Sequence, residues 1–324
     1  MKSLIISVFV CLSAVSWAQN RHENLSVNNV TVDTLNLKFL PKDEAANLLR
    51  LEDDISHRWN KFDILSRLKG KEGDKNDLLE FIAQQACDWT TDEVAFLRKT
   101  QNSINNVIRE KGLRLRYPEE IRMLKTTMME EDGAGGYTRD NYIVLIDRIK
   151  TAPQHIASLL VAHETFHILT RNNAEFRKRM YNLIGFNILP REVEFPQELK
   201  ERIITNPDVI RHDSYATFTI DGKQTDCAMV IYTKTPYEGG GVLKYMNMGL
   251  VAIDKDNCKA IEKDGKTVIY SIDDAEDFYK QVGKNTNYVF DPEEILAENF
   301  SFLLTNKQDL ETPELVQKME EICK

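Results

Sequence analysis

The stretch "LLVAHETFHILTRNN", residues 159–173, contains two histidines four positions apart, with a glutamate directly after the first. Its flanks are apolar, and nothing from Pro153 to Arg171 breaks a helix, so the pattern predicts a helix from about Pro153 to Thr170. Residues four apart lie on one face of a helix. His163 and His167 can therefore present two imidazoles to the same ion.

The five letters HETFH form the HExxH pattern, which supplies two zinc ligands and a general base. Zinc binds histidine nitrogen at about 2.0–2.1 Å, and a catalytic site keeps one position open for water. Glu164 is turned by one residue from His163, so it can reach that water rather than the ion. The alternative is a buried helix with two hydrogen-bonded histidines. A charged glutamate within so apolar a helix is costly unless it is paired or close to a metal, which favours the metal site.

A third ligand is expected from "DPEEILAENFSFLL", residues 291–304. Glu294 and Glu298 share a face of this predicted helix and have apolar neighbours. One can bind the metal. The other, one turn away, can accept a hydrogen bond from the ring nitrogen of a ligand histidine that does not bind the metal. The alternative is that acidic residues simply favour a helix N-terminus, which accounts for Glu293 better than for Glu298. His212 is a further candidate ligand.

Taken together, "HETFH" and the later "EEILAEN" resemble the gluzincin branch of zinc metallopeptidases, in which HExxH is followed by a glutamate ligand on a second helix. The resemblance assigns His163 and His167 as ligands and Glu164 as the general base. Glu294 takes the place of the third ligand, and Glu298 stands where the family usually has aspartate.

The glutamate at 298 is a departure, although ExxxE occurs in lethal-factor-type toxins of the same clan, and it leaves open whether Glu294 or Glu298 is the ligand. The metzincin continuation is absent, because Thr170 and Asn173 stand where its glycine and last histidine belong. The resemblance covers the HExxH helix and one later helix, not the whole chain.

The resemblance implies a zinc-dependent endopeptidase that acts on a peptide or protein substrate. Zinc would activate a water molecule, and Glu164 would take its proton. Tyr288, six residues before Glu294, is the candidate donor to the oxyanion, with His212 as its rival. The segment "YTRDNYIVLI", residues 137–146, is expected to be one strand that pairs with extended substrate or is simply part of a sheet. The competing function is an exported binding protein on an inactive scaffold, which has no need of Glu164.

Composition and the N-terminus set the cellular context. The chain has 324 residues, a net charge of -9 and 42% hydrophobic residues, enough for one large or two small domains. The acidic balance argues against nucleic acid as a partner.

Residues 1–18 read as a signal peptide cut after Ala18, which predicts a secreted or periplasmic protein; a buried N-terminal strand is the alternative. No later run approaches the roughly 18 apolar residues of a membrane span, so stable membrane insertion is not expected. The oligomeric state stays open.

The predicted organisation is a flexible leader at 19–40, a helical region at 41–116 and an α+β, zincin-like domain at 117–324, which is β-rich from 214 to 270. Whether residues 19–112 act as a propeptide is left open. Signal removal leaves four cysteines. Cys227 and Cys258 flank one β-rich segment and are the favoured disulfide pair, against the alternative of four unpaired thiols.

Overall fold

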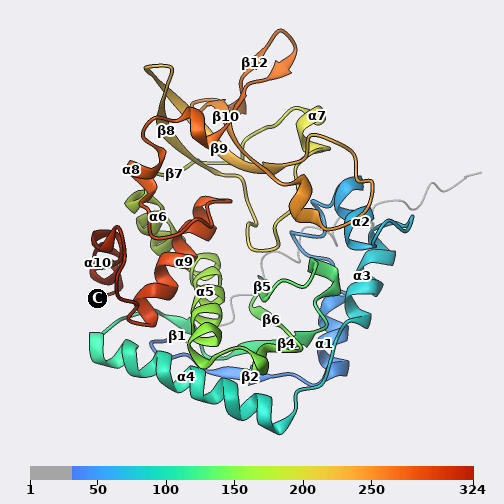
Figure 1. Cartoon of the computed structure of the whole chain (residues 1–324), viewed down its shortest axis with the longest axis vertical. Coiled ribbons are helices and arrows are strands. Elements are labelled where there is room, and N and C mark those ends of the chain that lie inside the picture. The colour runs from blue at the N-terminus through green and yellow to red at the C-terminus, as the bar shows by residue number, and fades with distance from the viewer. Residues whose placement is uncertain (1–30) are drawn as a thin grey trace, which may run out of the picture.

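The structure is a computed structural model that describes residues 31–324. The predicted signal peptide and the first part of the predicted leader lie outside these residues. Helices and strands both contribute substantially, as the α+β prediction requires. A pair of helices crosses the centre of the molecule, with a four-stranded sheet on one side and a larger antiparallel sheet on the other (Figure 1).

The four-stranded sheet has the order β2-β4-β6-β5. Its strands are β2 (Leu37–Phe39), β4 (Ile121–Thr126), β5 (Gly136–Arg139) and β6 (Tyr142–Ile146). The first three in this order run parallel, and β5 is an antiparallel edge strand. Residues 37–39 of the predicted leader are therefore part of the sheet.

The prediction of one strand over residues 137–146 is wrong, because β5 and β6 form a hairpin. Arg139 pairs with Tyr142, and the chain reverses at Asp140, whose φ of 44° is left-handed. Aspartate and asparagine tolerate this conformation better than other side chains with a β-carbon, and the two reversing residues are Asp140 and Asn141. The reversal makes β5, rather than the strand that leads into the HExxH helix, an edge strand of this sheet.

Four helices lie between β2 and β4 in the sequence. They are α1 (Lys42–Leu49), α2 (Lys61–Arg67), α3 (Lys75–Gln84) and α4 (Thr91–Lys111). Asn60, Asp74 and Thr90 close reciprocal capping boxes at the starts of the last three. Gly112, with φ of 67°, ends α4, which runs along the bottom of Figure 1 and packs against α5 and β2.

The central pair consists of α5 (Gln154–Asn172) and α9 (Pro292–Leu304), which pack side by side (Figure 1). The Phe166 and Phe300 rings meet between them with centroids 5.3 Å apart. Both helices are apolar on nearly all sides and buried along most of their length, as expected for helices inside a core. Their buried polar residues are therefore the exceptions that need a partner. The helices α6 (Ala174–Leu183) and α10 (Pro313–Cys323) flank the pair.

The antiparallel sheet has the order β11-β10-β9-β8-β7, and β14 also pairs with β10. Its strands are β7 (Asn187–Ile188), β8 (Ser214–Ile220), β9 (Lys223–Tyr232), β10 (Asn247–Asp254), β11 (Lys259–Ala260) and β14 (Ile269–Tyr270). Burial alternates along β8, as a strand with one covered face requires. The β-rich prediction for residues 214–270 is confirmed.

Smaller elements complete the fold. The strands β1 (Thr31–Val32) and β3 (Tyr117–Pro118) pair, as do β12 (Glu262–Lys263) and β13 (Lys266–Thr267). Two short helices are α7 (Gln197–Lys200) and α8 (Phe278–Val282). The connection from α7 to β8, residues 201–213, is largely irregular.

The favoured Cys227–Cys258 disulfide is not formed. All four cysteines between residues 31 and 324 are free. Cys227 belongs to the main core, whereas Cys258 belongs to a second apolar cluster with Phe195 and Leu199. Their side chains pack into different apolar clusters. The two thiols therefore do not meet, although both cysteines flank the same β-rich segment.

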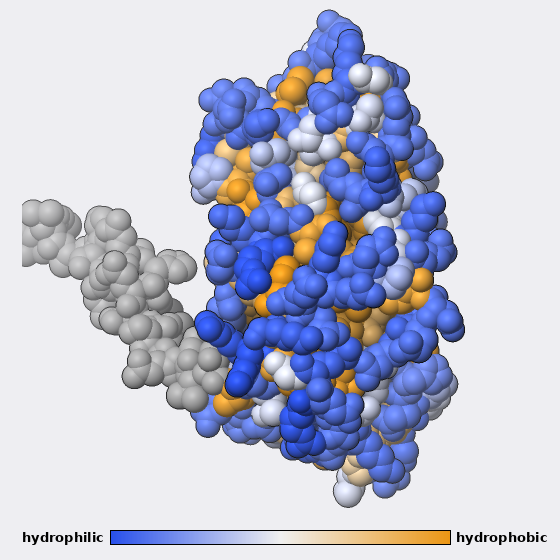
Figure 2. Space-filling view, turned by 90° about the vertical axis from the view of Figure 1, so that its left-hand side faces the viewer, coloured by the Kyte–Doolittle hydropathy of each residue, from blue (hydrophilic) through white to orange (hydrophobic). Residues whose placement is uncertain are grey.

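The surface of the face shown in Figure 2 is mostly hydrophilic, with apolar residues visible only in narrow patches. Across residues 31–324, no helix combines the length and the apolar character needed to span a membrane.

Candidate metal centre

Helix α5 presents His163 and His167 on one face, with ring centroids 5.0 Å apart. Both side chains are buried. The spacing of four residues places one ring above the other along the helix, and burial keeps both rings away from solvent. The two imidazoles thus form one half of a possible binding site.

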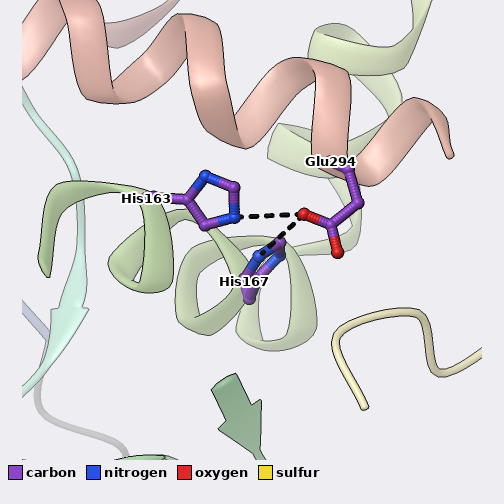
Figure 3. A group of neighbouring side chains, drawn as sticks. All are labelled: His163, His167 and Glu294. Carbon is purple, nitrogen blue, oxygen red and sulfur yellow. Dashed lines mark hydrogen bonds and ion pairs between the residues drawn. The ribbon is translucent and has the colours of Figure 1, made fainter. Parts of the chain in front are cut away.

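Helix α9 supplies the other half through Glu294, which is also buried. Its Oε2 lies 3.1 Å from Nε2 of His163 and 3.9 Å from Nε2 of His167 (Figure 3). Each of the three residues offers a ligand atom within 4.8 Å of the others. Tetrahedral donors at zinc bond lengths lie about 3.3 Å apart, so this spacing suits one ion.

Two further carboxylates face the outer nitrogens of the histidines. Nδ1 of His167 is 3.1 Å from Oε1 of Glu293, and Nδ1 of His163 is 3.3 Å from Oε1 of Glu298. A carboxylate on Nδ1 favours the tautomer with its proton there and leaves Nε2 as the free acceptor. When the two imidazoles are neutral, both Nε2 atoms would therefore direct a lone pair towards Oε2 of Glu294.

Glu293 contacts the site, although the sequence explained it only as an acidic residue that favours a helix N-terminus. Its Oε1 accepts a hydrogen bond from Thr170 and its Oε2 one from the Tyr181 hydroxyl at 2.7 Å. Thr170 follows His167 by three residues on the same helix, so the threonine at that spacing was the available signal. Tyr181 comes from α6, and no local pattern indicates that contact.

One buried atom of the site is left without a hydrogen-bond partner among the described residues. Nε2 of His167 has no hydrogen-bond partner within residues 31–324 and is shielded from solvent. Buried polar atoms are normally satisfied, and an orphan indicates a missing ion or water. A cation bound to the two Nε2 atoms and Glu294 would satisfy it. The donor set therefore fits a zinc ion.

The electrostatics of the centre also favour a bound cation. Burial alone would raise the pKa of Glu294, but the hydrogen bond with His163 and the charges of both histidines hold it at about 2. Burial would lower the pKa of His163, yet the carboxylates of Glu294 and Glu298 raise it well above its ordinary value. A buried carboxylate that stays ionised is suited to bind a cation.

Glu164 lies beside this centre and is buried. Its Oε2 accepts a hydrogen bond from the Thr138 hydroxyl of β5 at 2.7 Å, and burial raises its pKa. A β-carbon added at Gly136 would meet Oε1 of Glu164 at 3.2 Å, so the glycine leaves room for the carboxylate. Helix α5 thus carries Glu164, and the edge strand β5 fixes its carboxylate.

The connection between α7 and β8 contributes two residues to the site, Asn206 and Asp208. Asn206 donates to Oε1 of Glu294 at 2.5 Å. Asp208 lies 3.9 Å from Nε2 of His167 and accepts a hydrogen bond from the peptide N–H of Thr138 at 2.7 Å. Burial raises the pKa of Asp208 to about 8. The irregular segment gave no periodic signal that could have placed them here.

The structure separates the two candidate oxyanion donors. The Tyr288 ring lies 6.1 Å from the His163 ring, centroid to centroid, and the residue is 44% exposed. The charge of Glu294 is the main cause that raises the pKa of Tyr288, so its hydroxyl keeps its proton. His212 instead lines a separate cavity of about 400 Å³ with Arg58 and Glu192, where burial lowers its pKa to about 4. His212 is therefore neither a ligand nor a donor in this arrangement.

Comparison with known proteins adds no assignment. No protein-family model, curated protein or solved structure matches this chain. The functional argument thus rests on the geometry of the centre itself.

Proposed function

We propose that the protein is a zinc-dependent endopeptidase with a zincin-like catalytic region, related in its site to the gluzincin branch. The observation that carries the proposal is the convergence of two histidine Nε2 atoms and the Glu294 carboxylate, with one Nε2 left without a partner. His163, His167 and Glu294 would hold the ion, and Glu293 and Glu298 would orient the two imidazoles.

When bound, zinc would supply Lewis acidity to the scissile carbonyl and lower the pKa of water. Glu164 is the residue that would take the water proton and deliver it to the leaving amine. Its raised pKa suits that task, because a general base works best when its pKa lies closer to the operating pH. The hydrogen bond from Thr138 fixes one oxygen of Glu164 and leaves the other for the reaction.

Tyr288 is the proposed donor to the developing oxyanion. Its protonated hydroxyl can donate a hydrogen bond, and the ring borders the ligand His163. Tyr288→Phe is expected to lower turnover by about 10²-fold with zinc content unchanged, the typical effect of losing one such donor.

The proposal extends to location. A peptidase with a signal peptide at residues 1–18 would act outside the cytoplasm on exported or extracellular peptides and proteins. N-terminal sequencing of the exported chain would find Gln19 first.

Two measurements test the function directly. Metal analysis of the purified chain should give about one zinc per molecule. Glu164→Gln should keep that zinc and lose cleavage of casein and of a peptide library, because the amide cannot take a proton. Zinc-loaded wild type that cleaves nothing would favour the binding-protein alternative, and protein that binds no zinc would contradict both.

A further inference from the structure

A cavity of about 170 Å³ adjoins the candidate metal centre on the side of the β5 edge. Four of its lining residues tie it to that centre. Asn206 contacts Glu294, Asp208 approaches His167, Gly136 lies against Glu164, and the Tyr288 ring borders His163. Anything bound in the cavity therefore lies next to the proposed reacting atoms.

The rest of the cavity is mainly apolar. Its larger apolar side chains are Ile204, Ile231, Val242, Leu243, Met246 and Phe290. All of these except Leu243 belong to the small hydrophobic cluster that also contains Phe62 and Tyr245. Leu243 is 75% exposed, which places it at the mouth of the cavity. The cavity is thus an open apolar pocket, not a void sealed inside the core.

The charged groups in the lining are already paired. Arg67 binds Asp63 and Glu131, and Asp132 binds Lys69 and the peptide N–H of Val242. The remaining one, Asp208, is turned to Thr138 and the metal centre. No free charge is left among the described lining residues to attract a charged side chain.

We infer that this pocket selects the substrate: it accepts one large uncharged side chain, aliphatic or aromatic, at a fixed position beside the cleaved bond. The inference rests on the proposed peptidase function and adds its substrate class. The volume is well below the roughly 300–1,000 Å³ of sites for whole small molecules, and suits one side chain. Met246 and Leu243 are the proposed specificity-determining residues, because both line the pocket, Met246 is half-buried and Leu243 is exposed.

The test is a set of matched peptides that differ at one position next to the cleaved bond. Burial of a leucine or phenylalanine side chain is expected to raise kcat/KM about 10- to 100-fold over alanine, and lysine or glutamate should do no better than alanine. Met246→Glu should shift the preference towards lysine and arginine, and Met246→Leu should leave it unchanged. Leu243→Glu, at the exposed mouth, should shift it in the same direction by less and is a second variant if Met246→Glu fails to fold.

Binding of the same peptides to the zinc-loaded Glu164→Gln variant separates this inference from the proposed function. Fluorescence anisotropy of labelled peptides measures that binding. Preferential binding of leucine and phenylalanine peptides supports the pocket even if the wild type cleaves none of them. Equal cleavage or equal binding of all peptides overturns it while leaving the peptidase function intact. A Met246→Glu variant that folds and keeps the wild-type preference also overturns it.

Discussion

Two clusters of buried charged residues meet at the segment Thr205–Asn206, and they differ in one respect. In the first cluster, Asp63 accepts hydrogen bonds from Arg67 and from the peptide N–H and hydroxyl of Thr205. Arg67 also reaches Glu131 and the Thr205 carbonyl. In the second cluster, at the metal centre, Asn206 binds Glu294, but His167 keeps a buried nitrogen without a partner.

The difference separates a structural role from a functional one. A buried ion pair is tolerated when its hydrogen bonds are complete, and the Asp63 cluster meets that condition. The α5–α9 cluster brings several carboxylates and two histidines together and still leaves an acceptor open, which is unfavourable unless a cation completes it. The satisfied cluster also fixes Thr205, so it anchors the chain that carries Asn206 and Asp208 to the site.

The largest expected effect is on metal binding when Glu294 is removed. Zinc sites contribute about 10–16 kcal/mol of binding free energy, so loss of one of three ligands should weaken binding by roughly 10²- to 10⁴-fold. Glu294→Ala should show this in competition with a fluorescent zinc chelator. A variant with wild-type zinc affinity would exclude Glu294 as a ligand and break the contrast between the clusters.

The matched change in the satisfied cluster is Asp63→Asn. It leaves Arg67 buried with one carboxylate fewer, which should lower the free energy of unfolding by about 3 kcal/mol. Zinc affinity should fall by no more than about tenfold, since Asp63 reaches the centre only through Thr205 and Asn206. Urea unfolding of the zinc-free protein and the chelator assay measure the two quantities. A larger effect on zinc than on stability would reverse the assignment of roles.

Glu130 offers a third case, a buried carboxyl with neither a cation nor a candidate metal. Its Oε1 accepts from Thr126 and Tyr137, its Oε2 has no partner within the described residues, and burial raises its pKa from 4.5 to about 7. Because the pKa of Glu130 is higher in the folded than in the unfolded protein, its protonated carboxyl contributes stability that is fully present below about pH 4.5, the unfolded-state pKa. That stability, about 3 kcal/mol, is lost as the pH rises through 7.

Glu130→Gln should remove this loss. In zinc-free protein, the free energy of unfolding of the wild type should fall between pH 4.5 and 8 relative to that of the variant. Glu119→Gln, at an exposed position, is the control and should follow the wild type. Parallel curves for Glu130→Gln and wild type would show that this carboxyl titrates normally.

The clusters also show what could be predicted from the sequence. The positions of α5 and α9 followed from apolar runs without a helix breaker, and the i, i+4 spacing placed His163 and His167 on one face. These are local rules, and they hold because a helix fixes its own geometry. The hairpin at Asp140 was missed because an Asp-Asn turn was read as part of a continuous strand.

The partners in the α7–β8 connection could not be predicted. Asn206 and Asp208 lie in irregular chain whose path depends on tertiary contacts with Asp63 and Thr138, more than 60 residues away in sequence. The separation of Cys227 from Cys258 likewise depends on which apolar cluster each cysteine side chain packs into. Periodicity carries no information on such contacts.

The smallest effects are expected for the two outer carboxylates, and they should be unequal. Glu293→Gln removes the charge that holds Nδ1 of the fully buried His167, so zinc should bind about 10- to 100-fold more weakly. Glu298→Gln should cost less than about tenfold, because its side chain is 30% exposed and its 3.3 Å contact with His163 is partly screened. The same chelator assay ranks them. If Glu298→Gln instead matches the loss seen for Glu294→Ala, Glu298 is the third ligand, and the centre lies one turn further along α9.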